Sequence, residues 1–457
     1  MSRRIDVGSI RTQGGTEVST GTTAKLERVL AMIDQRSAEI IDFASNLIRQ
    51  PSINPDLEPN EAAERPAQEW LRDRFTASGA FDEIDFWEAA ANRPNVVGVR
   101  KGTGGGRSLI WSAHTDVAPV TPEQAAQWEG AGPFSGEVRD GKLWGRGASD
   151  MKGAIAAYTM ATVFLHDAGI KLKGDLRLAQ SVGEEAGRRD IGCNTVLARG
   201  HRADLAIFPE PSNFAIYPTV KGELYFRLTV PGKSTHICNR NLVAQPLPYG
   251  VERPGVSAID NMLKYQLAIL ELEKQWNLYR TNPHVPPGGM FININTMTAG
   301  ASLTSVPDSA EATGSLLFNP DLTADAVMAE IRATIDRVTA ADYWLREHPP
   351  TLDLPLDSAS SAPWIKEPVN MAHDHPSIAV IQRAMAAATG ETPAVRISPF
   401  VCDANFWFPL GQPCVIFGVG DPSWGIHGTN EHLPVADLIK ATKAFAAVTM
   451  EWCGVAE

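Results

Sequence analysis

Cysteine is scarce in this chain, and the few cysteines present form no recognisable pattern. Five occur among 457 residues, an odd number without a C-x-x-C pair. This scarcity argues against a disulfide framework and against a zinc site built from thiolates, and it predicts a reducing compartment. The five positions are Cys193, Cys238, Cys402, Cys414 and Cys453.

A long hydrophobic run is also missing. The longest apolar stretch, residues 154–165, is interrupted by Tyr158 and Thr159 and is too short to cross a bilayer, so it predicts a buried helix. Residues 1–23 contain no apolar segment, which indicates a flexible leader rather than a secretion signal or a membrane anchor. We therefore expect a cytoplasmic protein without a membrane partner.

Positively charged residues are also scarce. The chain has 41 Lys and Arg against 53 Asp and Glu, a net charge of −12, and no basic stripe runs along it. An acidic field repels the phosphate backbone, so we expect no nucleic-acid partner. The surplus acids either keep the surface soluble or gather in part around a cation. Apolar residues make up 44% of this long chain, which is enough for the large cores of two to three domains.

Short apolar runs alternate with helical patterns through the first half of the chain. Helical spacing covers residues 24–78 with a break at Pro51, and four apolar runs follow, at 95–99, 109–112, 176–181 and 205–208, with a crossover helix at 153–168. This alternation predicts the α/β class with a mostly parallel sheet.

The pattern changes near residue 220 and changes back after a proline-rich segment. The expected elements are strand 223–230, helix 258–276, strands 290–298 and 310–318, and helix 324–340, followed by helix 375–389, strand 413–419 and helix 435–453. We therefore predict a leader at 1–23, a sheet domain formed by 24–219 and 349–457, and an inserted α+β lobe at 220–348.

Acidic residues and histidines follow the expected strands. His114 and Asp116 share one side of an extended chain at the end of the second run, so the acid could orient the imidazole. Asp150, in a glycine-rich turn before a helix, taken alone could be a simple N-cap. The adjacent acids Glu184 and Glu185 end a buried strand, where like charges repel unless one is protonated or a cation is present.

Two more motifs belong to the same group. Glu210 follows the fourth apolar run, and His427 follows the strand predicted at 413–419. In open α/β sheets, ligands bind at the carboxyl ends of the strands, where all these residues are expected. Two histidines and several carboxylates without thiolates favour Zn²⁺, Mn²⁺ or Co²⁺, and the set is large enough for one or two ions.

The order of these motifs resembles a known family. H-x-D, G-R-G-x-x-D-M-K-G, G-E-E-x-G, P-E-P and a late H-G-x-x-E are similar to the acetylornithine deacetylase, succinyl-diaminopimelate desuccinylase, aminoacylase and glutamate carboxypeptidase superfamily of metallopeptidases. The resemblance implies a zinc-peptidase-like catalytic domain and an inserted lid and dimerisation domain. It also implies metal-dependent hydrolysis of a C–N bond.

The resemblance also implies a role for each matching residue. His114 and Glu210 would bind one metal ion, Glu185 and His427 the other, and Asp150 would bridge them. These are the metal ligands that the family pattern implies.

Three further residues match the family without being ligands. Asp116 would support His114, and Glu184 would be the general base. His236 would stabilise the oxyanion in the active site of a partner chain, which implies a homodimer or a higher homo-oligomer formed through the lid.

The lid departs from the family pattern in two places. Ile237 and Cys238 follow His236 where small residues are usual, and the strand at 310–318 lacks the arginine with which exopeptidase-like members bind a substrate carboxylate. This absence argues against a C-terminal peptide substrate and favours the deacylase-like branch. Candidate substrate-binding residues are Arg396 and Asn405, and other arginines that could replace the missing one are Arg188, Arg189 and Arg240.

Three functions remain open at this stage, all but the last acting on a small-molecule substrate. The first is deacylation of an N-acyl amine or amino acid. The second is hydrolytic removal of an amino group from an activated aromatic ring, as for 5-nitroanthranilate in this superfamily, which the aromatic residues Phe400, Trp407 and Trp424 favour. The third is an inactive homologue that only binds.

Overall fold

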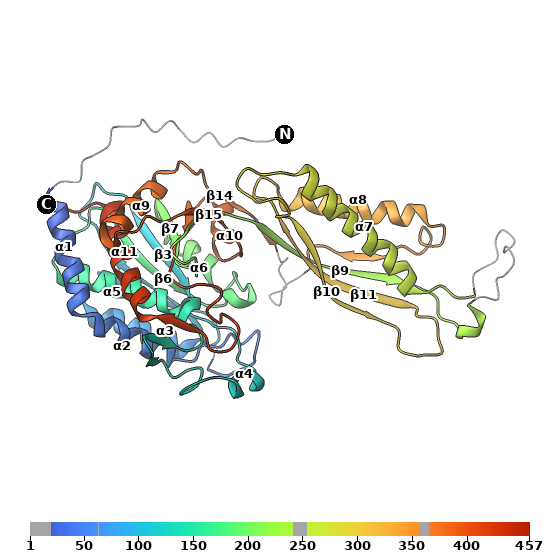
Figure 1. Cartoon of the computed structure of the whole chain (residues 1–457), viewed down its shortest axis with the longest axis horizontal. Helices are drawn as coiled ribbons and strands as arrows, with labels where there is room; N and C mark the ends of the chain where they lie inside the picture. The colour runs from blue at the N-terminus through green and yellow to red at the C-terminus, as the bar shows by residue number, and fades with distance from the viewer. Residues whose placement is uncertain (1–19, 63, 241–253, 357–364) are drawn as a thin grey trace.

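The computed structural model describes residues 20–62, 64–240, 254–356 and 365–457. Figure 1 shows a large domain, with a helix-covered sheet, and a narrower lobe that projects from it. The chain leaves the large domain after residue 220 and returns near residue 367, so the lobe is an insertion.

The large domain contains a nine-stranded sheet whose centre is parallel. Strands β6 (Leu176–Ser181), β3 (Leu109–His114), β7 (Leu205–Phe208) and β16 (Cys414–Ile416) are adjacent and parallel. Antiparallel strands extend both edges: β1 (Glu83–Ala90) and β2 (Arg93–Arg100) on one side, β8 (Ile216–Val220) and β14 (Val369–Asn370) on the other, with β15 (Val395–Ser398) parallel to β8. The predicted mostly parallel α/β sheet is confirmed.

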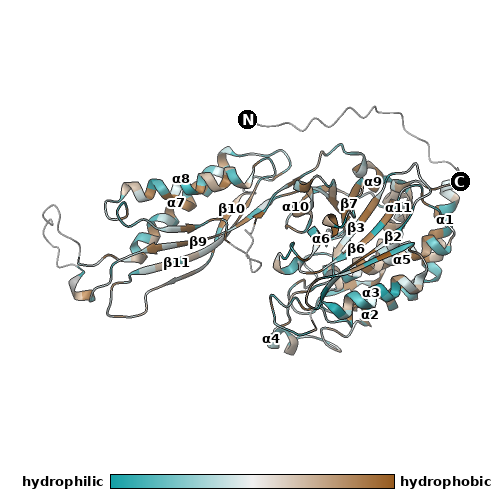
Figure 2. Cartoon of the chain, turned by 180° about the vertical axis from the view of Figure 1, so that it is seen from behind, coloured by the Kyte–Doolittle hydropathy of each residue, from teal (hydrophilic) through white to brown (hydrophobic). Residues whose placement is uncertain are grey.

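Helices cover both faces of this sheet. One face packs against α1 (Thr20–Gln35), α2 (Ser37–Ile48), α3 (Arg65–Ser78), α5 (Gly153–Asp167), α9 (Pro376–Thr389) and α11 (Val435–Cys453). The other packs against α6 (Cys193–Ala198) and α10 (Ala404–Trp407). Alternation along β3 divides its side chains between the two cores, with Trp111 on the first face and Ile110 on the second. Figure 2 shows the hydrophobic colour concentrated on the central strands and the inner faces of the helices.

The lobe is an antiparallel sheet covered by two helices. Its strands lie in the order β10 (Phe291–Ala299), β11 (Ser309–Phe318), β9 (Gly222–Pro231) and β12 (Thr351–Asp353), and β13 (Ile365–Lys366) also pairs with β9. Buried residues alternate along β9 and β11 and pack under α7 (Ala258–Tyr279) and α8 (Ala324–Ala341). Since β12 and β13 follow residue 348, this sheet includes residues beyond the predicted end of the lobe.

A small third sheet brings two distant loops together. It consists of β17 (His432–Pro434), β5 (Lys142–Trp144) and β4 (Glu137–Arg139), and the short helix α4 (Pro122–Ala126) precedes it. Pairing of β17 with β5 places the segment before residue 432 beside the glycine-rich turn after residue 144. Among the helices of the described ranges, none is both long and apolar enough to span a membrane.

Candidate metal centre

The five candidate metal ligands and Glu184 meet at the carboxyl ends of the parallel strands. His114 is the last residue of β3, and Glu210 lies two residues after β7. Glu184 and Glu185 begin a single 3-10 turn (Glu184–Ala186) soon after β6, and Asp150 lies in the turn that leads into α5. His427 comes from the loop between β16 and β17, so five separate chain segments form the site.

Two groups of side chains could each hold one metal ion. His114, Asp150 and Glu210 form the first, Asp150, Glu185 and His427 form the second, and within each group the ligand atoms lie within 4.8 Å of one another. The two oxygens of Asp150 face opposite groups: Oδ1 lies 3.3 Å from His114 Nε2, and Oδ2 lies 3.5 Å from His427 Nε2. Each oxygen of Asp150 therefore faces one of the two groups, and this residue could contact both ions.

The donor set fits divalent cations. Asp150 Oδ1 is buried and, within the part of the chain that the structure describes, accepts no well-aligned hydrogen bond. A buried carboxylate oxygen without a donor is costly, and a cation beside it would remove that cost. Imidazole nitrogen with carboxylate oxygen is a donor set that Zn²⁺, Mn²⁺ and Co²⁺ accept.

The crowding of acids also shifts their proton affinities. Burial raises the pKa of Glu210 far above its usual range, despite the attraction of His114. Burial likewise raises the pKa of Glu185 to about 7, and hydrogen bonds with Asp150 and Glu185 raise the pKa of His427 to about 10. Without a cation, protons supply the positive charge that the cluster requires, and a bound metal ion would displace them.

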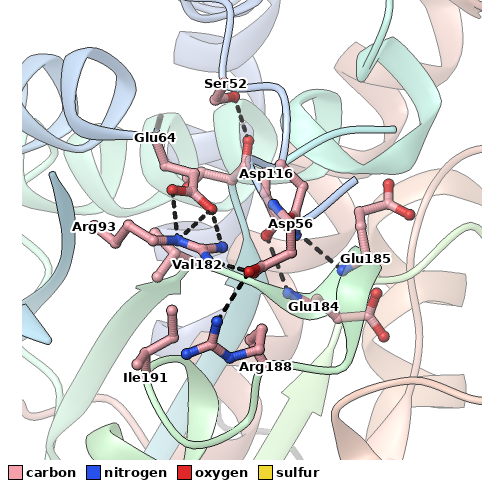
Figure 3. A network of polar contacts seen from close by, with 12 residues as sticks. Ser52, Asp56, Glu64, Arg93, Asp116, Val182, Glu184, Glu185, Arg188 and Ile191 are labelled. Atoms are coloured by element: carbon pink, nitrogen blue, oxygen red, sulfur yellow. Dashed lines mark hydrogen bonds and ion pairs between the residues drawn. The ribbon is translucent and has the colours of Figure 1, made fainter. Parts of the chain in front are cut away.

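Asp116 accepts hydrogen bonds from both sides of the site. Its Oδ1 accepts from the backbone N–H of Glu184 at 3.2 Å, and its Oδ2 accepts from the backbone N–H of Glu185 at 3.0 Å (Figure 3). Asn54 Nδ2 donates to the same Oδ2 at 2.7 Å, and His114 Nδ1 lies 2.9 Å from the Asp116 carbonyl oxygen. One buried side chain thus fixes the turn that carries both glutamates.

A chain of ion pairs connects this turn to the segment that precedes α3. Arg93 is buried and donates to both oxygens of Glu64, and it also pairs with Asp56. Asp56 in turn accepts from Arg188 at 2.9 Å, four residues after Glu184 (Figure 3). This network ties the segment between α2 and α3 to the turn, and it occupies Arg188, one of the candidates for the missing arginine.

Sequence reasoning missed the residues that hold the Asp150 turn. Glu431 is fully buried, and its Oε1 accepts from the backbone N–H groups of Ser149 and Asp150 at 3.0 and 3.1 Å. Its Oε2 pairs with buried Arg146 at 2.8 Å. Glu431 and Arg146 both lie in motifs quoted above. A single sequence, however, does not indicate that two residues 285 positions apart are in contact.

Lys366 is another residue that the sequence did not indicate. Its Nζ lies 3.8 Å from Glu184 Oε1 and 4.0 Å from Glu223 Oε2, and the side chain is only 7% exposed. Burial lowers the pKa of this amine, but Glu184 and Glu223 outweigh burial and raise it above its usual value. Glu184 belongs to neither group of metal ligands, so a cation faces the residue predicted to be the base.

Other predicted residues lie away from the metal ligands. His236 is exposed at the start of a turn (Ile237–Asn239) five residues after β9, a strand whose nine steps span about 30 Å from the large domain. Arg396 lines a separate cavity of about 300 Å³ with Tyr217 and Asp421. Asn405 is buried and donates through Nδ2 to the carbonyl oxygens of Lys221 and Glu367, at 2.9 and 2.7 Å.

The remaining candidates also have partners elsewhere. Arg240 pairs with Asp260 in the lobe, and the Arg189 guanidinium lies 4.9 Å from the centre of the Phe406 ring. The aromatic residues near His427 in sequence do not gather around the ligands: Trp407 is fully buried and donates to the Cys193 carbonyl, Phe400 packs on Tyr217, and Trp424 stacks on His432.

Known proteins are similar to this chain in sequence and in fold. The model of Peptidase family M20/M25/M40 matches residues 110–451. An N-formyl-4-amino-5-aminomethyl-2-methylpyrimidine deformylase of Halalkalibacterium halodurans is 30% identical over 433 residues, 94% of this chain and 97% of that protein. A succinyl-diaminopimelate desuccinylase of Methylorubrum populi is 31% identical over 418 residues, 89% and 96% of the two chains.

Solved structures agree on the fold at lower identity. A di-peptidase from Saccharomyces cerevisiae has a TM-score of 0.68 at 14% identity and covers 94% of this chain and 99% of its own. A tripeptidase from Staphylococcus aureus has a TM-score of 0.67 at 18% identity, with 91% and 98% covered. Together with the match over most of its length, these findings show that the chain belongs to the peptidase family M20/M25/M40.

Proposed function

We propose that this protein removes an acyl group from an N-acyl amine by metal-dependent hydrolysis of the C–N bond. The observation that carries the proposal is the shared Asp150 between two ligand groups, with Glu184 beside them and outside both. That arrangement could hold two cations, and it keeps one carboxylate outside both ligand groups for proton transfer.

The relatives support an amide of this kind. The two relatives described above are a deformylase and a desuccinylase, whose names specify different acyl groups removed from an amine. In β11, the strand where exopeptidase-like members of the superfamily carry a carboxylate-binding arginine, residues Ser309–Phe318 include none. Both points favour a substrate recognised by its acyl amide over a peptide recognised by its C-terminal carboxylate.

The chain's own residues have defined parts in the reaction. His114, Asp150, Glu185, Glu210 and His427 would hold the ions, which when bound polarise the carbonyl and lower the pKa of water. The Glu184 carboxylate accepts a proton from the attacking water and returns it to the amine nitrogen as the C–N bond breaks. The products are the carboxylic acid and the free amine.

We also propose a homodimer formed through the lobe, in which His236 stabilises the oxyanion in the partner's site. Two features of the lobe support it. Among the described residues, strand β10 pairs on one side only and forms an edge of its sheet, and α7 exposes a stripe of large apolar side chains. The members of this stripe are Ile259, Leu263, Leu267, Leu270 and Leu278.

We also propose a reducing, cytoplasmic location, which the five free cysteines support.

Mixing two inactive variants tests the dimer. If each site takes Glu184 from its own chain and His236 from the partner, then Glu184→Ala and His236→Ala, refolded together, form mixed dimers with one intact site each. We expect about a quarter of the wild-type rate, because about half of randomly formed two-fold dimers are mixed. No recovery, or a monomer by sedimentation, would exclude this arrangement.

A substrate screen tests the reaction itself. Purified protein supplied separately with Zn²⁺, Mn²⁺ or Co²⁺ is assayed for amine release from N-formyl, N-acetyl and N-succinyl amines, with Glu184→Gln as the matched inactive control. We expect hydrolysis of at least one acyl amide and a loss of about 10²-fold or more in the control. Ammonia release from aminobenzoates without amide turnover would favour the aromatic deamination, and no bound metal with no turnover would favour the inactive homologue.

A further inference from the structure

A buried lysine stands where the lobe joins the large domain. Lys366 is the last residue of β13 and lies opposite Glu223 of β9 in the antiparallel register. Glu367 and Pro368 then lead into β14, which pairs with β8 of the large sheet. The side chain thus leaves one of the two connecting strands and points at Glu184, across the boundary between the domains.

This lysine is unusual in its contacts. Among the described residues its Nζ makes no hydrogen bond, although it lies about midway between Glu184 and Glu223, at 3.8 and 4.0 Å. The Phe406 ring centre is 5.9 Å away, and Glu223 also accepts a hydrogen bond from Tyr225. Burying an ammonium group is costly, so the lysine depends on the two carboxylates close to it.

The position of Glu184 explains what a cation on this side could do. Glu184 is next to Glu185 in the chain, and its backbone is fixed by Asp116, but its carboxylate is held by no residue of the metal centre. Two bound cations would attract this carboxylate, and a carboxylate that becomes a ligand can no longer exchange a proton with water.

We propose that Lys366 is a positioning residue, which keeps the Glu184 carboxylate turned toward the connecting strands and out of the metal ligand set. Glu223 and Tyr225 of β9 hold the lysine from its other side. The inference rests on the proposed function, because it assigns Lys366 a part only if Glu184 is the base. Lys366 itself touches neither the reacting bond nor the metal ligands.

Kinetics of Lys366→Met, which keeps length and loses charge, test this proposal in the metal-loaded enzyme. We expect kcat to fall about 10- to 100-fold with KM changed less than about threefold, since misplacing a catalytic group by about 1 Å costs up to about 10²-fold. Bound metal measured by mass spectrometry should not decrease. Lys366→Arg, which restores the charge, should recover most of the loss.

Lys221→Met is the matched control, because Lys221 lies in the other connecting segment, between β8 and β9, and forms no ion pair with Glu184. It should leave kcat unchanged. Thermal melting checks folding, and Lys366→Gln replaces Lys366→Met, with the same expectation, if the latter does not fold. A kcat within about threefold of wild type, or a loss of metal and a rise in KM that account for the defect, overturns the positioning role. Wild-type enzyme inactive on every acyl amide refutes the proposed function instead.

Discussion

Replacing Asp116 by asparagine is the sharpest test of how the site is held together. The substitution keeps shape and size, but asparagine offers one acceptor oxygen where aspartate offers two. If that oxygen takes the Oδ2 position, it keeps the bonds from Asn54 and Glu185, and the new amide N–H₂ faces the N–H of Glu184. Two donors then confront each other in a buried place.

The cost follows from these contacts. Leaving the Glu184 N–H without an acceptor costs about 1–3 kcal/mol, and the two remaining bonds lose the added strength of a charged acceptor, about 0.5–1 kcal/mol each. Relief of the repulsion between Asp116 and Glu64 offsets part of the sum. We expect the free energy of unfolding of the large domain to fall by about 2–3 kcal/mol. We also expect metal affinity to fall about 10- to 100-fold, because the Glu184–Glu185 turn is no longer held in place.

Urea unfolding of the metal-free protein and titration with Zn²⁺ measure these two quantities. The control is Asp73→Asn, at an exposed position on α3 whose acid, among the described residues, forms an ion pair only with its neighbour Arg72, and it should change stability by less than about 0.5 kcal/mol. If Asp116→Asn shifted neither the urea midpoint nor the metal affinity beyond this control, the turn would be held by something other than Asp116.

Three further predictions concern the same site. Glu431→Gln leaves Arg146 buried beside a neutral partner, so the free energy of unfolding, measured with urea, should fall by about 3 kcal/mol. The double variant Glu431→Met with Arg146→Met should be more stable than either single variant. Removal of metal by a chelator should abolish activity and lower the urea midpoint, and added metal should restore both. Near pH 7 in the metal-free protein, His427 (pKa about 10) is protonated and Glu185 (pKa about 7) is about half protonated, so metal uptake should release at least about one proton, and metal affinity should rise from pH 6 to 8. Calorimetry in two buffers of different ionisation enthalpy measures this release, and equal heats would contradict it.

The sequence predicted most of the fold where the pattern was strong. Strands β6 and β7 and helix α11 have the predicted bounds, because short apolar runs flanked by polar or glycine residues, and a long helical spacing, leave little choice. Strand β1 was missed because it is an edge strand with few buried side chains, and β8 because Pro218 interrupts its pattern.

The residues of the candidate site were likewise predictable only in part. His114, Asp150, Glu185, Glu210 and His427 each follow a recognisable strand or turn, and the rule that ligands gather at the carboxyl ends of strands brings them together without coordinates. Lys366 follows no motif, and the importance of Glu431 appears only when the third sheet aligns its segment with the Asp150 turn. Such contacts depend on how distant segments meet, which periodicity does not encode.

The buried amide of Asn405 limits how the lobe can move. The Asn405 Nδ2 donates to one carbonyl oxygen on each of the two segments that join the domains, at Lys221 and Glu367, so these segments cannot slide past each other or separate without losing at least one of the bonds. We therefore expect the two segments to move together if the lobe tilts about this point. In such a rotation, residues near the connecting segments move little, and residues at the far end of the lobe move much further. Lys366 sits at the pivot and His236 beyond the end of β9, so swinging the lobe would carry the histidine over a long arc and leave the base undisturbed.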